Sequence, residues 1–331
     1  MDFLKVTSSP HMRHEDSTRI IMLDVLIALC PALIWAVIVF GARALILTLV
    51  SVASCVLFEF LYRLIMKKPC SVGDLSAAVT GVLLAFCLPV SVPIWLPVVG
   101  SFFAIVIVKQ LYGGIGKNVV NPALAARVFL FLAYPDKLGG SAFTIPKASL
   151  PLFGNVNLTP DVVASATPLA NLSEGAAPTE DIFTLFLGER AGCIGEVSIL
   201  MILAGALYLL VRKIITWHIP VAYIVTVAVV SYIFPASGMD AVQYVLCELC
   251  SGGLMLGAFF MATDYTTSPV SAKGRIIYGI GCGLITMFVR NCGGYPEGVS
   301  FAILIMNCLA WYIDKFTRPR VFGGAKKNVK K

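Results

Sequence analysis

The sequence predicts an all-α polytopic membrane protein with about ten transmembrane helices. Of the 331 residues, 58% are hydrophobic and 13% are charged, whereas soluble domains average roughly 45–50% and about 25%. The mean hydropathy of +0.89 excludes a pair of soluble domains, a disordered chain and a small disulfide scaffold. The apolar residues form continuous runs, unlike the alternation over about ten residues that is typical of membrane β-barrels.

Ten segments are long and apolar enough to cross a bilayer, which takes roughly 20 residues in a helix. Their approximate ranges are 20–40, 43–66, 72–90, 92–110, 119–134, 193–211, 214–234, 241–262, 274–290 and 297–314. Residues 1–18 contain no apolar core and no small-residue cleavage site. We therefore expect the first span to act as an uncleaved anchor.

The positions of the basic residues predict the orientation. With ten spans, 19 of the 25 lysines and arginines fall on the side of the N-terminus and five fall on the other side. Cytoplasmic loops carry the excess of positive charge, so both termini are expected in the cytoplasm and the long 135–192 loop outside it. The net charge of +7 is then a topology signal, and we expect no nucleic-acid partner.

The two halves of the chain look like an inverted duplication. Span starts in the second half follow those in the first by 169–182 residues, and a Gly-Gly pair at 113–114 has a counterpart at 293–294. An odd number of spans per half inverts the second copy, as in many transporters. The predicted domains are a five-helix repeat (1–134), an extracytoplasmic loop (135–192), a second repeat (193–314) and a basic tail (315–331).

Few side chains suggest a metal site or an ion path. Cys247 and Cys250 form the one CxxC, which lies inside an apolar segment and is better explained by packing. We expect no metal. Asp24, Glu59 and Glu248 are acids within spans, so each is a candidate for an ion path or else pairs with a base inside the protein.

Two polar stretches have the composition of a ligand site. Gly113-Gly-Ile-Gly-Lys-Asn-Val-Val-Asn-Pro-Ala123 precedes the fifth span. Gly113 and Gly114 allow close approach of the backbone, and Asn118 and Asn121, if helical, share a face. Amides suit the edge of a heterocycle. The alternative is a tight loop whose asparagines cap the next helix.

The second polar stretch follows the eighth span. Met261-Ala-Thr-Asp264 ends an apolar segment and leads into Thr266, Thr267, Ser268 and Pro269. Asp264 is a candidate for the same ligand site, or it builds a local turn.

Several motifs together resemble a known family. They are Ser9-Pro-His11, the 113–123 stretch, Phe259-Phe-Met-Ala-Thr-Asp264, Lys273-Gly274, Gly293-Gly-Tyr-Pro-Glu-Gly298 and Ala302-Ile-Leu-Ile-Met-Asn307. Over nearly its whole length the chain resembles the D subunits of Rnf ion-translocating ferredoxin:NAD oxidoreductase complexes. It is more distantly similar to the B subunits of sodium-pumping NADH:quinone oxidoreductases.

The resemblance implies two flavins. In the family a threonine at the end of a pattern such as Asp-x-x-Ser/Thr-Gly/Ser-Ala-Thr carries FMN through a phosphoester. Asp161, Ser165, Ala166 and Thr167 match this pattern, and Ala164 departs from it. A second, noncovalent flavin, riboflavin in the relatives, is expected near Gly113, Gly114, Asn118, Asn121 and Asp264.

The resemblance also implies the function. It predicts a flavin-carrying subunit of a redox-driven ion pump in the bacterial plasma (inner) membrane, which passes electrons between ferredoxin and NAD and moves Na⁺ or H⁺. Expected partners are other membrane and peripheral Rnf subunits, including another covalent-flavin subunit and iron–sulfur subunits, and a flavin transferase. NAD and ferredoxin are expected to bind other subunits. The alternatives are a solute transporter without redox chemistry and a structural scaffold subunit.

Overall fold

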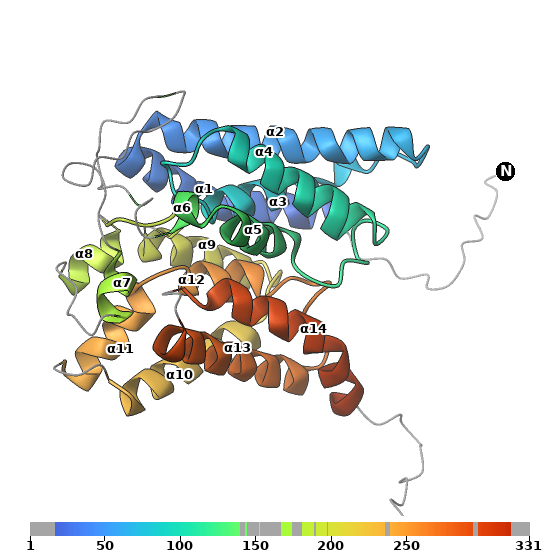
Figure 1. Ribbon diagram of the computed structural model, residues 1–331. Helices are drawn as coiled ribbons and strands as arrows, with labels where there is room; N and C mark the ends of the chain where they lie inside the picture. Colours follow the sequence, from blue (N-terminus) through green and yellow to red (C-terminus); the bar gives the residue numbers. More distant parts are fainter. Residues whose placement is uncertain are drawn as a thin grey trace, which may run out of the picture.

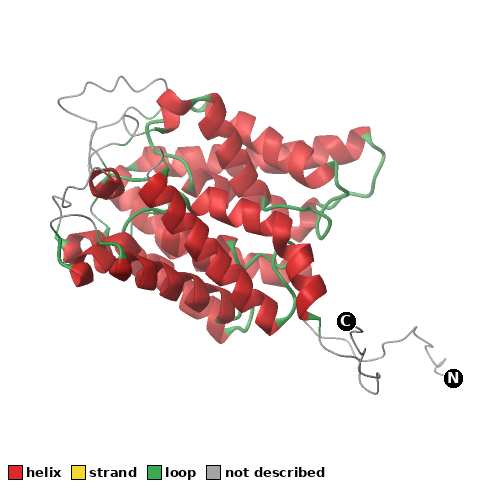
Figure 2. Ribbon diagram, turned by 60° about the horizontal axis from the view of Figure 1, so that its bottom comes forward, coloured by secondary structure: helices red, strands yellow, loops and turns green. Residues whose placement is uncertain are grey.

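Helices make up the regular secondary structure of the part of the chain that the structure describes (Figures 1 and 2). The computed structural model describes residues 17–139, 143, 152, 167–173, 181–188, 190–196, 198–235, 239–293 and 297–318. Within these ranges the β contact is an isolated bridge between Pro89 and Cys193. The predicted all-α class is confirmed.

The helices follow one another as the hydropathy predicts. The first half contains α1 (Thr18–Phe40), α2 (Ala42–Ile65), η1 (Val72–Asp74), α3 (Ser76–Phe86), α4 (Trp95–Phe102), η2 (Phe103–Gln110) and α5 (Pro122–Ala133). The middle segment contains α6 (Pro135–Leu138), α7 (Pro168–Ser173) and α8 (Ile182–Leu187). The second half contains α9 (Ile199–Val211), α10 (His218–Ile233), α11 (Ala241–Cys250), α12 (Leu254–Leu256), η4 (Gly257–Met261), α13 (Ala272–Cys292) and α14 (Val299–Thr317). Of the η segments, η1 is a 3₁₀ turn and η2 and η4 are π-helices.

Helix length supports a multi-pass membrane protein but does not confirm ten crossings. Among the described residues, α1, α2, α13 and α14 are long and apolar enough to span a bilayer, and α11 with α12–η4 makes a fifth if this pair, bent by 63°, is one span. The 12-residue α5 rises only about 18 Å, against a hydrocarbon core of about 30 Å.

The observed helix ends correct the expected boundaries. α9 begins at Ile199 and α14 at Val299, so Glu196 and Glu297, which fall inside the expected spans, lie in the loops before these helices. α14 continues to Thr317, three residues beyond the expected end of the tenth span.

The bend between α11 and α12 is stabilised by arginines. Gly252 has a φ of +67°, which only glycine adopts readily. The turn frees backbone carbonyl groups: Cys250 O accepts from Arg190, and Ser251 O accepts from Arg290 Nη2 at 3.3 Å. Irregular backbone at membrane depth requires such internal partners.

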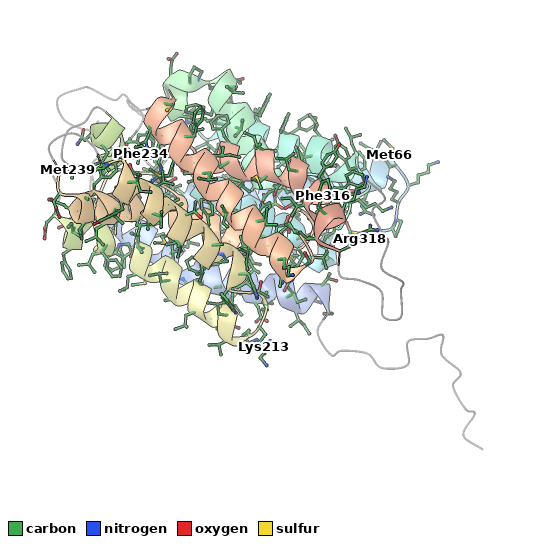
Figure 3. The ribbon with its side chains drawn as sticks, turned by 90° about the horizontal axis from the view of Figure 1, so that it is seen from below. Met66, Lys213, Phe234, Met239, Phe316 and Arg318 are labelled. Carbon is green, nitrogen blue, oxygen red and sulfur yellow. The ribbon has the colours of Figure 1, made fainter. Side chains whose placement is uncertain are left out.

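Small residues bring helices of the two halves together. α1 packs along α9, where a Cβ added to Gly205 would overlap the carbonyl oxygen of Ala28. Packing partners also recur between the halves: α2 contacts α3 and α4, while α10 contacts α11 and α13. In Figure 3 the end of α2 at Met66 and the end of α14 at Phe316 lie at one end of the molecule, and Phe234 and Met239 lie at the other.

Candidate functional site

Thr167 lies beside a cavity of about 300 Å³, here called the Thr167 cavity. Its other lining residues come from the end of the first half, the middle segment, the turn between α11 and α12, and the start of α14 with the residue before its N-cap. They are Arg127, Val128, Phe131, Pro135, Leu138, Gly139, Phe143, Pro168, Leu169, Arg190, Ala191, Gly192, Glu196, Gly252, Glu297, Ser300 and Phe301. Asp161, Ser165 and Ala166, which complete the attachment motif, lie outside the described residues.

Charged side chains from three segments meet at the wall of the Thr167 cavity. Arg127 of α5 donates from Nη1 to Glu297 Oε1 at 3.0 Å, and the same nitrogen lies 3.5 Å from Glu196 Oε1. The Gly253 N–H also donates to Glu297 Oε1, at 3.3 Å. Burial raises the pKa of the Glu196 carboxyl, and the neighbouring Glu297 carboxylate raises it further.

The Thr167 cavity fits a ring with a polar edge and apolar faces. Among the described residues, Ser300 Oγ is buried there without a hydrogen-bond partner, and Glu196 Oε1 is buried with the ion pair to Arg127 but no hydrogen bond. Buried polar groups are usually hydrogen-bonded. Phe131 and Phe301 meet edge to face, with their ring centroids 6.5 Å apart. An isoalloxazine ring on Thr167 would find polar partners and aromatic walls within reach.

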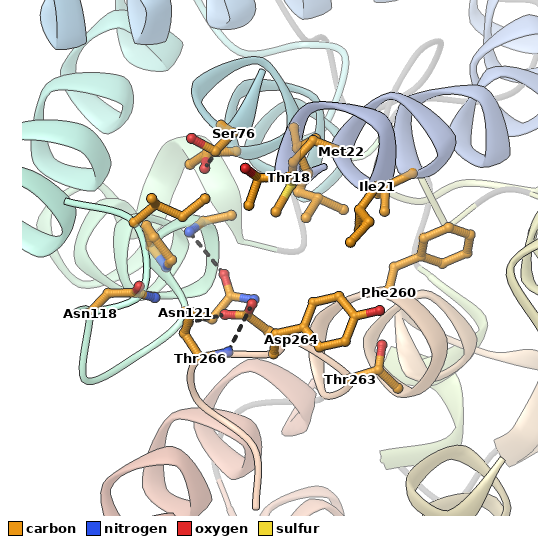
Figure 4. Close-up of a pocket in the computed structure, with 18 of the residues that line it drawn as sticks. Thr18, Ile21, Met22, Ser76, Asn118, Asn121, Phe260, Thr263, Asp264 and Thr266 are labelled. Carbon is orange, nitrogen blue, oxygen red and sulfur yellow. Dashed lines mark hydrogen bonds between the residues drawn. The ribbon is translucent and has the colours of Figure 1, made fainter. Parts of the chain in front are cut away.

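A second cavity, here called the Asn118 cavity, has a volume of about 380 Å³ (Figure 4). Asn118, Asn121 and Asp264 all line it, although Asp264 comes from the other half of the chain. Ile21, Met22, Leu83, Phe259 and Phe260 are among its apolar lining residues. The structure thus brings together three of the residues that the sequence predicts for the second flavin.

Gly113 and Gly114 lie in the turn before α5 and do not line the Asn118 cavity. Their φ angles of +117° and +96° form the turn before the cavity, and Gly116 rather than either of them lines it. A side chain at Gly114 would lie 2.6 Å from Arg63 Nη2. These glycines allow the turn, and their place in a ligand site stays a prediction.

Asn118 and Asn121 do not share a helix face. Asn118 lies in the loop and donates from Nδ2 to Val120 O at 3.2 Å. Asn121 is the N-cap of α5: its Oδ1 accepts from Ala123 N at 3.0 Å and Leu124 N at 3.4 Å. The capping alternative is therefore correct for Asn121, and the loop rather than helical periodicity brings the two amides together.

Asn121 and Asp264 are each fixed by hydrogen bonds. Asn121 Nδ2 donates to Met261 O at 3.2 Å and so joins the start of α5 to the end of η4. Asp264 accepts from Thr266 Oγ1 at 3.0 Å and from Thr267 Oγ1 at 3.2 Å. Burial raises the pKa of the Asp264 carboxyl, while these hydrogen bonds oppose the shift.

The three membrane acids singled out in the sequence are all paired. Asp24 accepts from Tyr208 at 2.7 Å and from Arg212 Nη2 at 2.9 Å. Glu59 pairs with Lys109 at 2.8 Å, and Glu248 pairs with Arg290. Each of these acids therefore pairs inside the protein, and a place in an ion path stays a prediction.

Several polar residues of the cavity walls were not singled out in the sequence. Lys109 lines the Asn118 cavity, and Arg190 and Ser300 line the Thr167 cavity. One signal was available, since Lys109 directly ends an apolar run of the length of a span.

Comparison with known proteins agrees with the resemblance. The sequence model of the NQR2, RnfD, RnfE family matches residues 5–323. The chain is 49% identical to the D subunit of the Na⁺-translocating ferredoxin:NAD⁺ oxidoreductase complex of Acetobacterium woodii, covering 98% of this chain and 96% of that relative. It is 38% identical to the D subunit of the proton-translocating complex of Clostridium ljungdahlii, with 96% of each chain covered. It is 40% identical to the D subunit of the ion-translocating oxidoreductase complex of Stutzerimonas stutzeri, with 92% and 91% covered. The chain belongs to the NQR2, RnfD, RnfE family.

Proposed function

We propose that the chain is a membrane subunit of a multi-subunit, ion-translocating ferredoxin:NAD⁺ oxidoreductase and that it carries two flavins. The relatives' names support this function over a solute transporter, since each names the D subunit of such a complex. The observation that carries the flavin part is the position of Thr167, which lines a cavity where, among the described residues, Ser300 Oγ is buried without a hydrogen-bond partner and Glu196 Oε1 has only its ion pair with Arg127. The flavin would supply the redox chemistry, and the chain would supply its binding, orientation and electrostatics.

In this proposal FMN is esterified to Thr167, with Asp161, Ser165 and Ala166 as the recognition pattern for a flavin transferase. Glu196, Ser300 and the Arg127 guanidinium would hold the polar edge of its ring. The Asn118 cavity would hold a noncovalent flavin, riboflavin in the related proteins, between its amides and its apolar walls.

Helix α5 would separate the two flavins by a short distance. Its N-cap, Asn121, lines the Asn118 cavity, and Arg127 lines the Thr167 cavity. Six residues of α-helix rise about 9 Å. Electrons from ferredoxin would move between the two flavins over this distance. They would reach NAD through partner subunits that carry iron–sulfur centres and another covalent flavin.

The topology is part of the same proposal. We infer ten crossings in two inverted five-helix repeats, with both termini cytoplasmic and the 135–192 segment outside the bacterial inner membrane. The recurrence of packing partners between the halves supports the duplication. Na⁺ and H⁺ are both candidate coupling ions, because two of the relatives are named for different ions.

Intact-mass analysis of the chain, expressed with a flavin transferase, tests the attachment site. We expect a mass increase of FMN less one water on the peptide that contains Thr167. Thr167→Ala should abolish it, Thr167→Ser should keep it because the hydroxyl remains, and the neighbouring control Thr184→Ala should leave it unchanged. Covalent flavin in the Thr167→Ala protein would disprove the assignment.

A further inference from the structure

A buried ion pair borders the Asn118 cavity. Lys109 lines this cavity and is only 3% exposed. Its Nζ lies 2.8 Å from Glu59 Oε2, a carboxylate that is fully buried in α2. Among the described lining residues, Lys109 is the one basic side chain and Asp264 the one acid. Lys109 lies near the end of the fourth expected span, and η2 carries it into the interior of the protein.

Hydrogen bonds hold the Lys109 ammonium at the cavity wall. Its Nζ donates to Ser76 Oγ at 2.6 Å, and Ser76 Oγ in turn donates to Asp74 Oδ1 at 2.5 Å. Ser76 itself lines the cavity, and Figure 4 shows it across from Asn118 and Asp264. The charge is therefore fixed next to the space that a ligand would fill.

The Glu59 carboxylate is held just as firmly, on the side away from the cavity. It accepts from Ser71 Oγ at 2.6 Å and from Gln110 Nε2 at 2.9 Å as well as from Lys109. Two consecutive residues of η2 thus reach one carboxylate. Glu59 is not among the residues that line the cavity, so a ligand there would lie nearer to the cation than to its partner.

We propose that Lys109 sets the redox potential of the ligand in the Asn118 cavity, and that Glu59 limits its effect. This inference rests on the proposed second flavin. Each electron that enters a bound ring adds one negative charge unless a proton follows it. A buried ammonium stabilises that charge because water and salt screen it only weakly. The nearby carboxylate opposes the stabilisation, so the two members of the pair act with opposite signs.

The test is a potentiometric titration of the noncovalent flavin in the purified full-length chain. A Thr167→Ala background removes the covalent flavin, so that the visible absorbance reports on the noncovalent one alone. Lys109→Gln should shift the ratio of reduced to oxidised flavin about tenfold toward oxidised, which is a fall of about 59 mV for a one-electron couple. Glu59→Gln should raise the potential. Lys213→Gln is the matched control, because Lys213 is exposed and follows α9, whose Leu209 lines the same cavity.

The Lys109→Gln/Glu59→Gln double variant guards against misfolding, since removing one partner of a buried pair is strongly destabilising. It removes both charges together, and its potential should fall below that of the parent chain because the nearer cation dominates. A double-variant potential at or above the parent value overturns the inference. So do single variants that shift the potential in the same direction, or by no more than Lys213→Gln does. A parent chain without noncovalent flavin refutes the proposed second site, and this inference with it. Bound flavin with unchanged potentials refutes the inference alone.

Discussion

Substitutions at Asn118 and Asn121 should separate ligand binding from helix capping. Asn121 Oδ1 accepts from two backbone N–H groups in the first turn of α5, and one N–H of its amide donates to Met261 O. Among the described residues, this leaves one amide N–H for a ligand. Asn118 uses one N–H on Val120 O, so its Oδ1 and its other N–H remain for the cavity. We therefore expect Asn118 to be the main amide of the proposed flavin site and Asn121 to be mainly structural.

The magnitudes follow from these contacts. Asn121→Leu removes a cap worth about 0.5–2 kcal/mol and leaves the buried Met261 carbonyl unpaired, at about 1–3 kcal/mol. Asn121→Asp keeps an acceptor at the N-cap, where a negative charge is also favourable. Asn118→Leu costs the fold only one hydrogen bond, about 0.5–1.5 kcal/mol. Asn118→Leu would also leave one polar edge of the bound ring without a hydrogen bond. This costs about 1–3 kcal/mol of binding free energy, which lowers flavin affinity roughly 5- to 150-fold.

Two measurements on the same detergent-purified proteins distinguish these roles. Thermal unfolding should show a larger loss of stability for Asn121→Leu than for Asn118→Leu, with Asn121→Asp between the parent and Asn121→Leu. Acid extraction should show the larger loss of noncovalent flavin in folded Asn118→Leu, with the FMN on Thr167 retained. Full noncovalent flavin in both folded Asn118→Leu and Asn121→Asp would show that the cavity does not bind the ring through these amides.

Three further predictions concern the fold and the topology. Arg127→Met should lower the free energy of unfolding by about 3–5 kcal/mol, because the buried Glu196 and the partly buried Glu297 lose their cation. Denaturant unfolding in detergent measures this, and a loss below about 1 kcal/mol would contradict it. Gly205→Ala should lower the free energy of unfolding by about 1–3 kcal/mol or more in the same assay, because its Cβ would overlap a neighbouring backbone carbonyl. Gly73→Ala is the control: its Cβ meets open space, so the free energy of unfolding should change by no more than about 0.5 kcal/mol. In intact cells a membrane-impermeant thiol reagent should label a cysteine introduced at position 150 and not one at position 325, and the opposite pattern would reverse the proposed orientation.

The sequence by itself determined where the helices lie. A segment that crosses a membrane must be predominantly apolar whatever it packs against, so its hydropathy can be read from the local sequence. Each of the ten expected ranges overlaps a described helix or a run of consecutive helices, and the Pro122 that follows an asparagine marks the start of α5. The resemblance of the motifs was enough to identify the family, which the match over residues 5–323 confirms.

Only the tertiary structure decided which polar groups meet. Arg127 finds Glu297 170 residues away, and Asn121 finds the Met261 carbonyl 140 residues away. Hydropathy predicts that a segment is buried, but it carries no information on which helices are adjacent. The same limit applies to Lys109. The sequence shows only a charge at the end of an apolar run, and the packing shows that a carboxylate from another helix lies beside it. Burial of a charge requires a partner, and the partner is a property of the packing rather than of the sequence around the charge.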